Sequence, residues 1–358
     1  MTFLKILLLL LTALAIAWFL MRSPIKSYPE SPQFRNGQFH NAAAQPEESP
    51  GKRLQILWHF LFNKPANTQP AKPIPVQMLT QSDLDAAPDR SLFKLGHSTV
   101  LLKLRGSYWL TDPVFSERAF ALQWMGPKRF HAPAIALADL PPLRGVILSH
   151  DHYDHLDKHA IRALIDRSEL FLAPLGVGDR LRGWGVPADK IRQFDWWQSI
   201  EVGGLTLTAT PGQHFSGRSL SDSRRTLWTS WVIEDENLRI FFSGDSGYFD
   251  GFAEIGQRFG PFDLTLMETG AYDAQWPFVH MQPEQSVQAH IDLRGKVMLP
   301  IHNSTFDLAM HSWYDPLERV LTISQEKGVQ LSTPVFGERI DIERPAPGSA
   351  WWRELSAP

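Results

Sequence analysis

The chain has 358 residues, with 35 Lys and Arg against 38 Asp and Glu, so its net charge at pH 7 is −3. A charge this close to zero argues against nucleic acid as a partner, because nucleic-acid binding depends on a basic surface. The sequence has no cysteine, which excludes disulfides, cysteine-ligated metals and a thiol nucleophile. A hydrophobic content of 43% is enough for one large globular core or two small ones.

The amino terminus is apolar from Ile6 to Met21, interrupted by a single threonine, with Lys5 before the run and Arg22 after it. As a helix this run would extend about 24 Å, somewhat less than a hydrocarbon core of ~30 Å. We expect residues 1–22 to form an uncleaved membrane anchor that is not part of the folded domain. The alternative is a cleaved signal segment, although its Ala-x-Ala sites would lie inside the apolar run.

Residues 23–75 are rich in Pro, Asn, Gln and Ser, which predicts a linker or a strap lying on the domain. Within this segment Leu54, Leu57, Trp58 and Leu61 recur at helical spacing. We expect this short helix to pack on the domain, with a lipid surface as the alternative.

Residues 76–345 predict the main α/β domain, and residues 346–358 predict a tail. Short apolar runs bounded by Gly, Pro and Asp predict strands at Ser91–Lys94, Thr99–Leu104, Tyr108–Thr111, Gly145–Ser149, Leu170–Ala173, Leu205–Thr210, Thr229–Glu234, Arg239–Ser243, Leu264–Glu268 and Lys296–Pro300. Helices are predicted at Lys158–Asp166, Val177–Trp184, Phe249–Phe259, Pro283–Asp292 and Pro316–Lys327. A meander of strands followed by strands mixed with helices is typical of stacked sheets with helices outside.

A dense group of metal-ligand residues follows the apolar strand Gly145–Ser149. Within six residues the chain carries His150, His152, Asp154 and His155. Imidazole nitrogens and carboxylate oxygens suit Zn²⁺ and related ions. Because residues two apart in an extended segment point the same way, His150 and His152 can share one ion, with Asp154 and His155 offset toward a second.

Two ions need more ligands than this segment supplies, and three candidates follow other predicted strands. These are His214, Asp245 and His302, each one to four residues beyond a strand end. A lone His or Asp after a strand is usually a turn or capping residue, so each of the three is a weaker prediction alone than the six-residue group.

The motif His150-x-His152-x-Asp154-His155, followed in order by His214, Asp245 and His302, resembles the hallmark of metallo-β-lactamase-fold hydrolases. Within that superfamily the sequence is similar to the N-acylphosphatidylethanolamine-hydrolysing phospholipases D and their bacterial relatives over roughly residues 34–320. The similar stretches are Phe34–Asn41, Leu95–Val100, Leu110–Ser116, Met125–Phe130, Ser149–Asp157, Gly256–Asp263 and His280–Glu284. Two departures from the animal pattern are Asn303-Ser304 after His302 and the amino-terminal apolar run.

The resemblance implies an αββα four-layer sandwich with two Zn²⁺ ions at one edge, between the sheets. It implies that His150, His152 and His214 hold one zinc, that Asp154, His155 and His302 hold the other, and that Asp245 bridges them. It also implies a phospholipid substrate. From the amino-terminal apolar run we expect a location at the bacterial inner membrane, with the periplasmic side favoured; a homodimer is left open.

Two zinc ions would lower the pKa of a shared water and supply hydroxide to attack a phosphodiester. Asp151 then either accepts a proton or assists the leaving group, or it orients a ligand histidine. His280 either contacts the substrate phosphate or simply opens the Pro283 helix. Asp112 is expected to support a ligand, and Tyr153 to line the pocket.

The leading hypothesis is therefore a zinc-dependent phosphodiesterase of phospholipase D type that acts on phosphatidylethanolamine or its N-acylated form. A second hypothesis uses the same metals in a lactonase, β-lactamase or nuclease, and the lack of a basic patch disfavours the nuclease. The third is a membrane-tethered envelope or regulatory protein without enzymatic activity.

Overall fold

The computed structural model describes residues 25–43, 50–219 and 221–356. The predicted anchor at residues 1–22 lies outside this part of the chain. Among the described residues, no helix has the length and apolar character needed to cross a membrane.

Two seven-stranded sheets form the centre of the domain. The first has the order β16-β3-β4-β5-β6-β7-β8 and the second the order β15-β14-β13-β12-β11-β10-β9. The strands of the first sheet are β3 (Ser91–Lys94), β4 (Val100–Leu104), β5 (Ser107–Thr111), β6 (Leu143–Ile147), β7 (Ser168–Pro174), β8 (Ile191–Phe194) and β16 (Arg339–Asp341). Those of the second are β9 (Ser199–Val202), β10 (Leu205–Thr210), β11 (Ser230–Asp235), β12 (Leu238–Phe242), β13 (Phe262–Glu268), β14 (Gly295–Ile301) and β15 (Gln330–Leu331).

Each sheet is antiparallel in one half and parallel in the other. The pairs β5–β6, β6–β7 and β7–β8 are parallel in the first sheet, as are β12–β13, β13–β14 and β14–β15 in the second. Parallel strands end at the same edge of a sheet, so the loops after β5, β6, β12, β13 and β14 emerge together.

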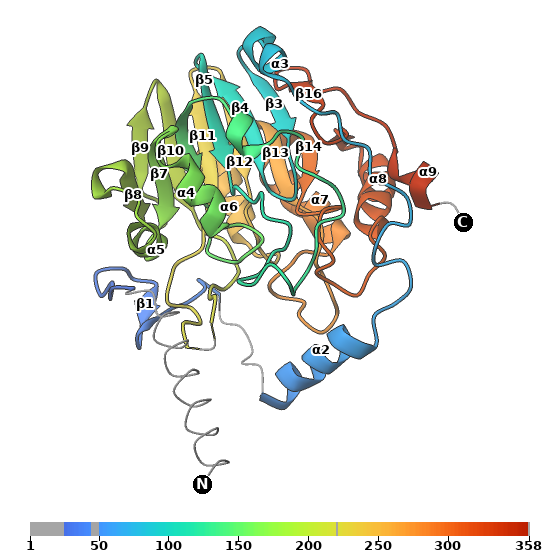
Figure 1. Cartoon of the computed structure of the whole chain (residues 1–358), viewed down its shortest axis with the longest axis horizontal. Helices are drawn as coiled ribbons and strands as arrows, with labels where there is room; N and C mark the ends of the chain where they lie inside the picture. The colour runs from blue at the N-terminus through green and yellow to red at the C-terminus, as the bar shows by residue number, and fades with distance from the viewer. Residues whose placement is uncertain (1–24, 44–49, 220, 357–358) are drawn as a thin grey trace.

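Helices cover the outer face of both sheets (Figure 1). The helices along the chain are α2 (Pro50–Phe62), α3 (Gln81–Ala86), α4 (Lys158–Leu164), α5 (Val177–Gly183), α6 (Gly251–Phe259), α7 (Pro283–Asp292), α8 (Asp315–Lys327) and α9 (Trp352–Ser356), with short 3₁₀ turns at Leu137–Asp139 and Ala188–Lys190. Helices α4 and α5 pack on the first sheet, and α6, α7 and α8 pack on the second. This arrangement confirms the predicted αββα four-layer sandwich.

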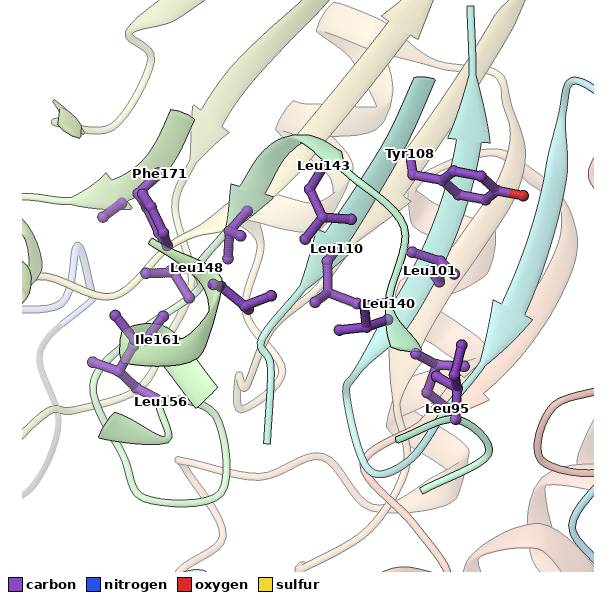
Figure 2. Packing of buried hydrophobic residues seen from close by; sticks show 14 of the residues in the cluster. Leu95, Leu101, Tyr108, Leu110, Leu140, Leu143, Leu148, Leu156, Ile161 and Phe171 are labelled. Carbon is purple, nitrogen blue, oxygen red and sulfur yellow. The ribbon is translucent and has the colours of Figure 1, made fainter. Parts of the chain in front are cut away.

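The core lies in three layers, one between the sheets and one under each set of helices. The layer between the sheets contains Trp109 from the first sheet and Trp231 from the second, both about 1% exposed or less. Figure 2 shows the layer on the first sheet, where Leu110, Leu148 and Phe171 meet Ile161 of α4. Alternate residues of the strands thus face two different cores, which explains why β3, β4 and β10 are buried along most of their length.

The segments outside the sandwich are tied to it by specific contacts. In the expected strap, the small hairpin of β1 (Phe34–Arg35) and β2 (Gln38–Phe39) lies over Trp196 and Trp228. At the carboxyl end, in the expected tail at 346–358, Trp352 is fully buried. Both terminal segments therefore contribute to the packing of the domain.

Candidate metal centre

The predicted ligands gather where the two sheets meet, at the carboxyl ends of their parallel strands. A backbone hydrogen bond joins the two sheets here: the carbonyl of Ser149 accepts from the Thr229 N–H at 2.9 Å. The Trp231 indole also donates to Leu148 O at 2.9 Å. These contacts hold the loop after β6 against the start of β11.

The first ligand set consists of His150, His152 and His214. Nδ1 of His152 lies 2.9 Å from Nε2 of His150 and 3.2 Å from Nε2 of His214. Oδ2 of Asp245 is 3.7 Å from Nε2 of His150 and 3.6 Å from Nε2 of His214. Four ligand atoms from both sheets therefore surround one point.

The second set consists of Asp154, His155 and His302. Oδ2 of Asp154 lies 3.5 Å from Nε2 of His155 and 3.3 Å from Nε2 of His302. Asp245 reaches this set as well, with Oδ1 3.0 Å from Nε2 of His155 and Oδ2 3.1 Å from Nε2 of His302. Asp245 thus adjoins both sets.

These distances fit metal ions better than hydrogen bonds. An ion bonded at about 2.0–2.2 Å in a tetrahedron separates its ligand atoms by about 3.4 Å, close to the contacts of both sets. Nε2 of His155, Nε2 of His302 and Oδ1 of Asp245 are buried without a hydrogen-bond partner among the described residues. Buried polar atoms without partners are costly, and an ion at each set would supply the missing interaction.

The electrostatics of the first set match metal binding. Burial, reinforced by neighbouring imidazoles, holds the pKa of His150 well below its usual range, and burial does the same for His214. Against the effect of burial, His155 and His302 hold the pKa of Asp245 well below its usual range. Neutral imidazoles and ionised carboxylates are the forms that bind metals. In the second set, and against the effect of burial, the carboxylates of Asp245 and Asp154 raise the pKa of His155 and of His302, so an ion there would displace protons from these rings.

Two ligand histidines are oriented by hydrogen bonds on their other nitrogen. Nδ1 of His155 lies 2.7 Å from Oδ2 of Asp112, and Nδ1 of His214 lies 2.8 Å from Val279 O. Oδ1 of Asp112 also accepts the Ser149 N–H at 2.7 Å. These contacts place the proton on Nδ1 and leave Nε2 free to bind a metal, so Asp112 lies where a supporting residue was expected.

The other predicted site residues take different positions. Asp151 is buried, but its carboxylate accepts from Arg180 at 2.7 Å and from the Gly217 N–H at 2.8 Å, so the structure does not bring it into the ligand sets. Both oxygens are occupied, which gives no support to proton transfer by Asp151. Tyr153 stacks under the guanidinium of Arg218 and donates to Arg218 O.

His280 lies next to ligands of both metal sets. Its ring centroid is 5.1 Å from that of His214 and 5.2 Å from that of His302, which belong to different ligand sets. Its Nδ1 is in hydrogen-bond contact with Oε1 of Glu268. The structure therefore places His280 beside both sets.

Sequence reasoning missed three residues of this site. Nε2 of His97 lies 3.2 Å from Oδ2 of Asp154, Glu268 contacts His280, and Asn41 brackets the backbone of His214. His97 and Glu268 stand at the ends of the predicted strands Ser91–Lys94 and Leu264–Glu268, which is the signal that located the other ligands. Asn41 does not follow a predicted strand, and its one signal is that it lies in Phe34–Asn41, a stretch that resembles the phospholipase D family.

Comparison with known proteins agrees with this geometry. Residues 108–303 match the beta-lactamase superfamily domain. An uncharacterised protein of Mycobacterium tuberculosis is 42% identical over 90% of this chain and 88% of its own length. The N-acyl-phosphatidylethanolamine-hydrolyzing phospholipase D 1 of Caenorhabditis elegans is 35% identical over 74% of this chain and 79% of its own length.

A solved structure supports the fold. The isothiocyanate hydrolase from Delia radicum gut bacteria superposes with a TM-score of 0.56 at 22% identity, covering 70% of this chain and 98% of that one. The chain belongs to the metallo-β-lactamase superfamily, and it is a metal-dependent hydrolase.

Proposed function

We propose that this protein is a two-zinc phosphodiesterase of phospholipase D type that cleaves phosphatidylethanolamine or its N-acylated form. The observation that carries the proposal is the position of Asp245, whose two carboxylate oxygens lie within reach of both three-residue sets. Paired metal sites that share a carboxylate are suited to displacement at phosphorus, because both the attacking and the leaving oxygen carry charge.

The two bound ions would activate water and offset negative charge on the phosphoryl group. The residues of the chain orient the metal ligands, exclude bulk water and contact the substrate. Asp112 and Val279 O fix the ligand imidazoles, and the surrounding burial excludes bulk water. His280 stands beside the space between the two sets, where a hydrogen bond to the substrate is in reach.

The substrate class is supported by the relative from Caenorhabditis elegans, by its name. The net charge of −3 gives no support to a nuclease.

The test is a lipid assay of the full, zinc-loaded protein with vesicles of mixed phosphatidylethanolamine and N-acylphosphatidylethanolamine. We expect release of phosphatidic acid, and we expect both chelator and Asp245→Ala to abolish it. The control is Asp263→Ala, which removes a surface ion pair with Lys296 and should leave the release unchanged. Free fatty acid as the sole product would refute the phospholipase D reaction. Hydrolysis of lactones or β-lactams with intact phospholipid would favour the second class of hydrolase.

We further propose that the metal edge faces a lipid surface, as a membrane-bound substrate requires. The loop between Arg118 and Lys128 carries Trp124, which is 74% exposed, and Phe120, whose ring lies 5.6 Å from that of Tyr153. Gln123 accepts from the backbone of Arg118 and donates to it, so this apolar loop is ordered. Ordered, exposed large apolar side chains mark an interaction surface.

The first described residues of the chain lie near the same edge. Lys26 N–H donates to Asp179 at 2.7 Å, and Asp179 lies in the first turn of α5, just after the carboxyl end of β7. The apolar run of residues 6–21 ends shortly before this point, so an anchor there would hold the metal edge toward the bilayer.

Sedimentation with phosphatidylethanolamine–phosphatidylglycerol vesicles tests this surface. Trp124→Ala should weaken binding severalfold while Ile291→Ala, on the outer helix α7, leaves it unchanged. Equal binding by both variants would remove the loop from the interface.

A further inference from the structure

Glu268 is a buried acid that the proposed reaction has not yet used. It ends β13, its side chain is fully buried, and no Lys or Arg of the described residues pairs with it. Its Oε2 accepts the Ser246 N–H at 2.7 Å, and its Oε1 contacts Nδ1 of His280. A carboxylate in such a place is costly unless its hydrogen bonds serve a purpose.

The backbone of Glu268 is held as firmly as its side chain. Its N–H donates to the Ser243 hydroxyl at 2.8 Å, and its carbonyl accepts from the Ser286 hydroxyl at 2.7 Å. The second of these contacts ties β13 to the first turns of α7, the helix that His280 precedes. Glu268 is therefore a rigid support for the ring of His280.

His280 has one nitrogen bound and one nitrogen available. Nδ1 is engaged by Glu268, and no described residue hydrogen-bonds Nε2. The ring stands beside His214 of one ligand set and His302 of the other. A group bound between the two sets would therefore meet the edge of the ring opposite to Glu268.

We propose that Glu268 is a positioning residue: it shares one proton with Nδ1 of His280 and holds the ring so that the second proton of the pair, on Nε2, faces the oxygen that leaves phosphorus. This inference rests on the proposed phosphodiesterase function. As hydroxide attacks, the new P–O bond forms, the bond from phosphorus to the headgroup oxygen breaks, and its electron pair stays on that oxygen. The proton of Nε2 passes to the same oxygen while the shared proton settles on Nδ1, so the ring ends neutral beside the Glu268 carboxylate. A proton from water then restores Nε2–H. The arrangement follows the logic of a histidine oriented by a buried carboxylate.

Glu268 has one competing role, as a metal ligand. One ligand atom from each of Asp245, Glu268, His280 and His302 lies within 4.8 Å of the others. The two oxygens of Glu268 are already committed to Ser246 and His280, which favours the positioning role. The competing role predicts that metal content falls when Glu268 is changed, whereas the positioning role predicts no fall.

Glu268→Gln is the direct perturbation. Its amide can accept the Ser246 N–H and donate to a bare Nδ1 of His280, but it cannot release a proton to Nδ1 as Nε2 loses its own. Glu268→Asp is a second variant that keeps the charge and loses the reach to His280. Glu254→Gln, an exposed glutamate paired with Arg258 on α6, is the matched control.

The experiment compares two phosphodiesters that differ in their leaving group. Dihexanoyl phosphatidylethanolamine expels an alkoxide, which needs a proton, and methyl 4-nitrophenyl phosphate expels a stable phenolate. We expect Glu268→Gln and Glu268→Asp to lower kcat about 100-fold on the lipid and less than about fivefold on the nitrophenyl ester, with wild-type zinc content. In a His280→Gln background, Glu268→Gln should have almost no further effect.

Three results would overturn the inference: loss of zinc in Glu268→Gln, equal losses on both esters, or additive effects in the double variant. A wild type that cleaves neither ester would refute the proposed phosphodiesterase itself, which separates the two failures.

Discussion

The hydrogen bond from His155 to Asp112 allows one ligand set to be weakened separately. In Asp112→Asn the side chain keeps its size but loses one acceptor oxygen. In the wild-type protein, Oδ1 of Asp112 accepts the Ser149 N–H at 2.7 Å, while Oδ2 faces Nδ1 of His155 at 2.7 Å. An asparagine that still serves Ser149 would turn its NH₂ toward His155, so the ring would lose the acceptor that holds its Nδ1–H.

The expected magnitude follows from what such supporting carboxylates contribute. Removing one typically lowers metal affinity about 10–100-fold, or about 1.4–2.7 kcal/mol. The weakening should fall mainly on the set of Asp154, His155 and His302, because Asp112 contacts His155 directly and reaches His150 through the Ser149 hydroxyl. We therefore expect one zinc to become easier to remove than the other.

The assay is zinc content after dialysis against graded concentrations of chelator. Wild type should lose both ions over one range, whereas Asp112→Asn should pass through a plateau near one ion per chain. Asp157→Asn is the control: this buried carboxylate caps α4 and accepts from Phe115 and Ser116, so it should lower stability without changing zinc affinity. Joint loss of both ions from Asp112→Asn, or wild-type affinity for both, would refute the reasoning.

Three further outcomes are expected. Removal of metal by chelator should abolish hydrolysis and lower the melting temperature, since orphaned ligand atoms would stay buried; an unchanged melting temperature would contradict the fit of the sets to metals. Asn41→Ala should lower the free energy of unfolding by about 1–3 kcal/mol in urea titrations, because it strands the buried backbone of His214 and leaves the Trp228 indole with Gly212 O as its one acceptor; a change within error would make the strap dispensable. Burial lowers the pKa of Lys94 to about 7, against 10.5 for its ordinary value, so between these values the unfolded chain binds one proton more. The stability of wild type relative to Lys94→Met should therefore rise from pH 7 toward pH 10, and a flat difference would exclude the shift.

Much of the sandwich was predictable because its central strands carry their own signal. Ser91–Lys94 and Leu205–Thr210 were placed at their observed bounds, since the first is centred on two apolar residues and the second alternates apolar residues with threonine, each between turn residues. The edge strand β9 (Ser199–Val202) was missed, because it is only partly buried and lacks such a run. The strand β16 was missed because its pairing with β3 joins segments far apart in the chain.

The ligand group at His150 to His155 was predictable from density alone, but its surroundings were not. The side chain of Asp151 turns to Arg180 of α5, a contact that depends on how that helix packs. His97 and Glu268 are single residues after strands, and only the meeting of the sheets brings them to Asp154 and His280. Local pattern thus predicts which residues can bind, while packing decides what they face.

The two ligand sets draw on both sheets, with one group of ligands after β6 and the others after β10, β12 and β14. Neither half of the chain carries a complete site. Ions therefore cannot be bound fully until both halves have folded and docked, and once bound they cross-link segments that are more than a hundred residues apart. Metal loading is in this sense the last step of assembly, and a metal-loaded chain is one in which the interface between the sheets is already correct.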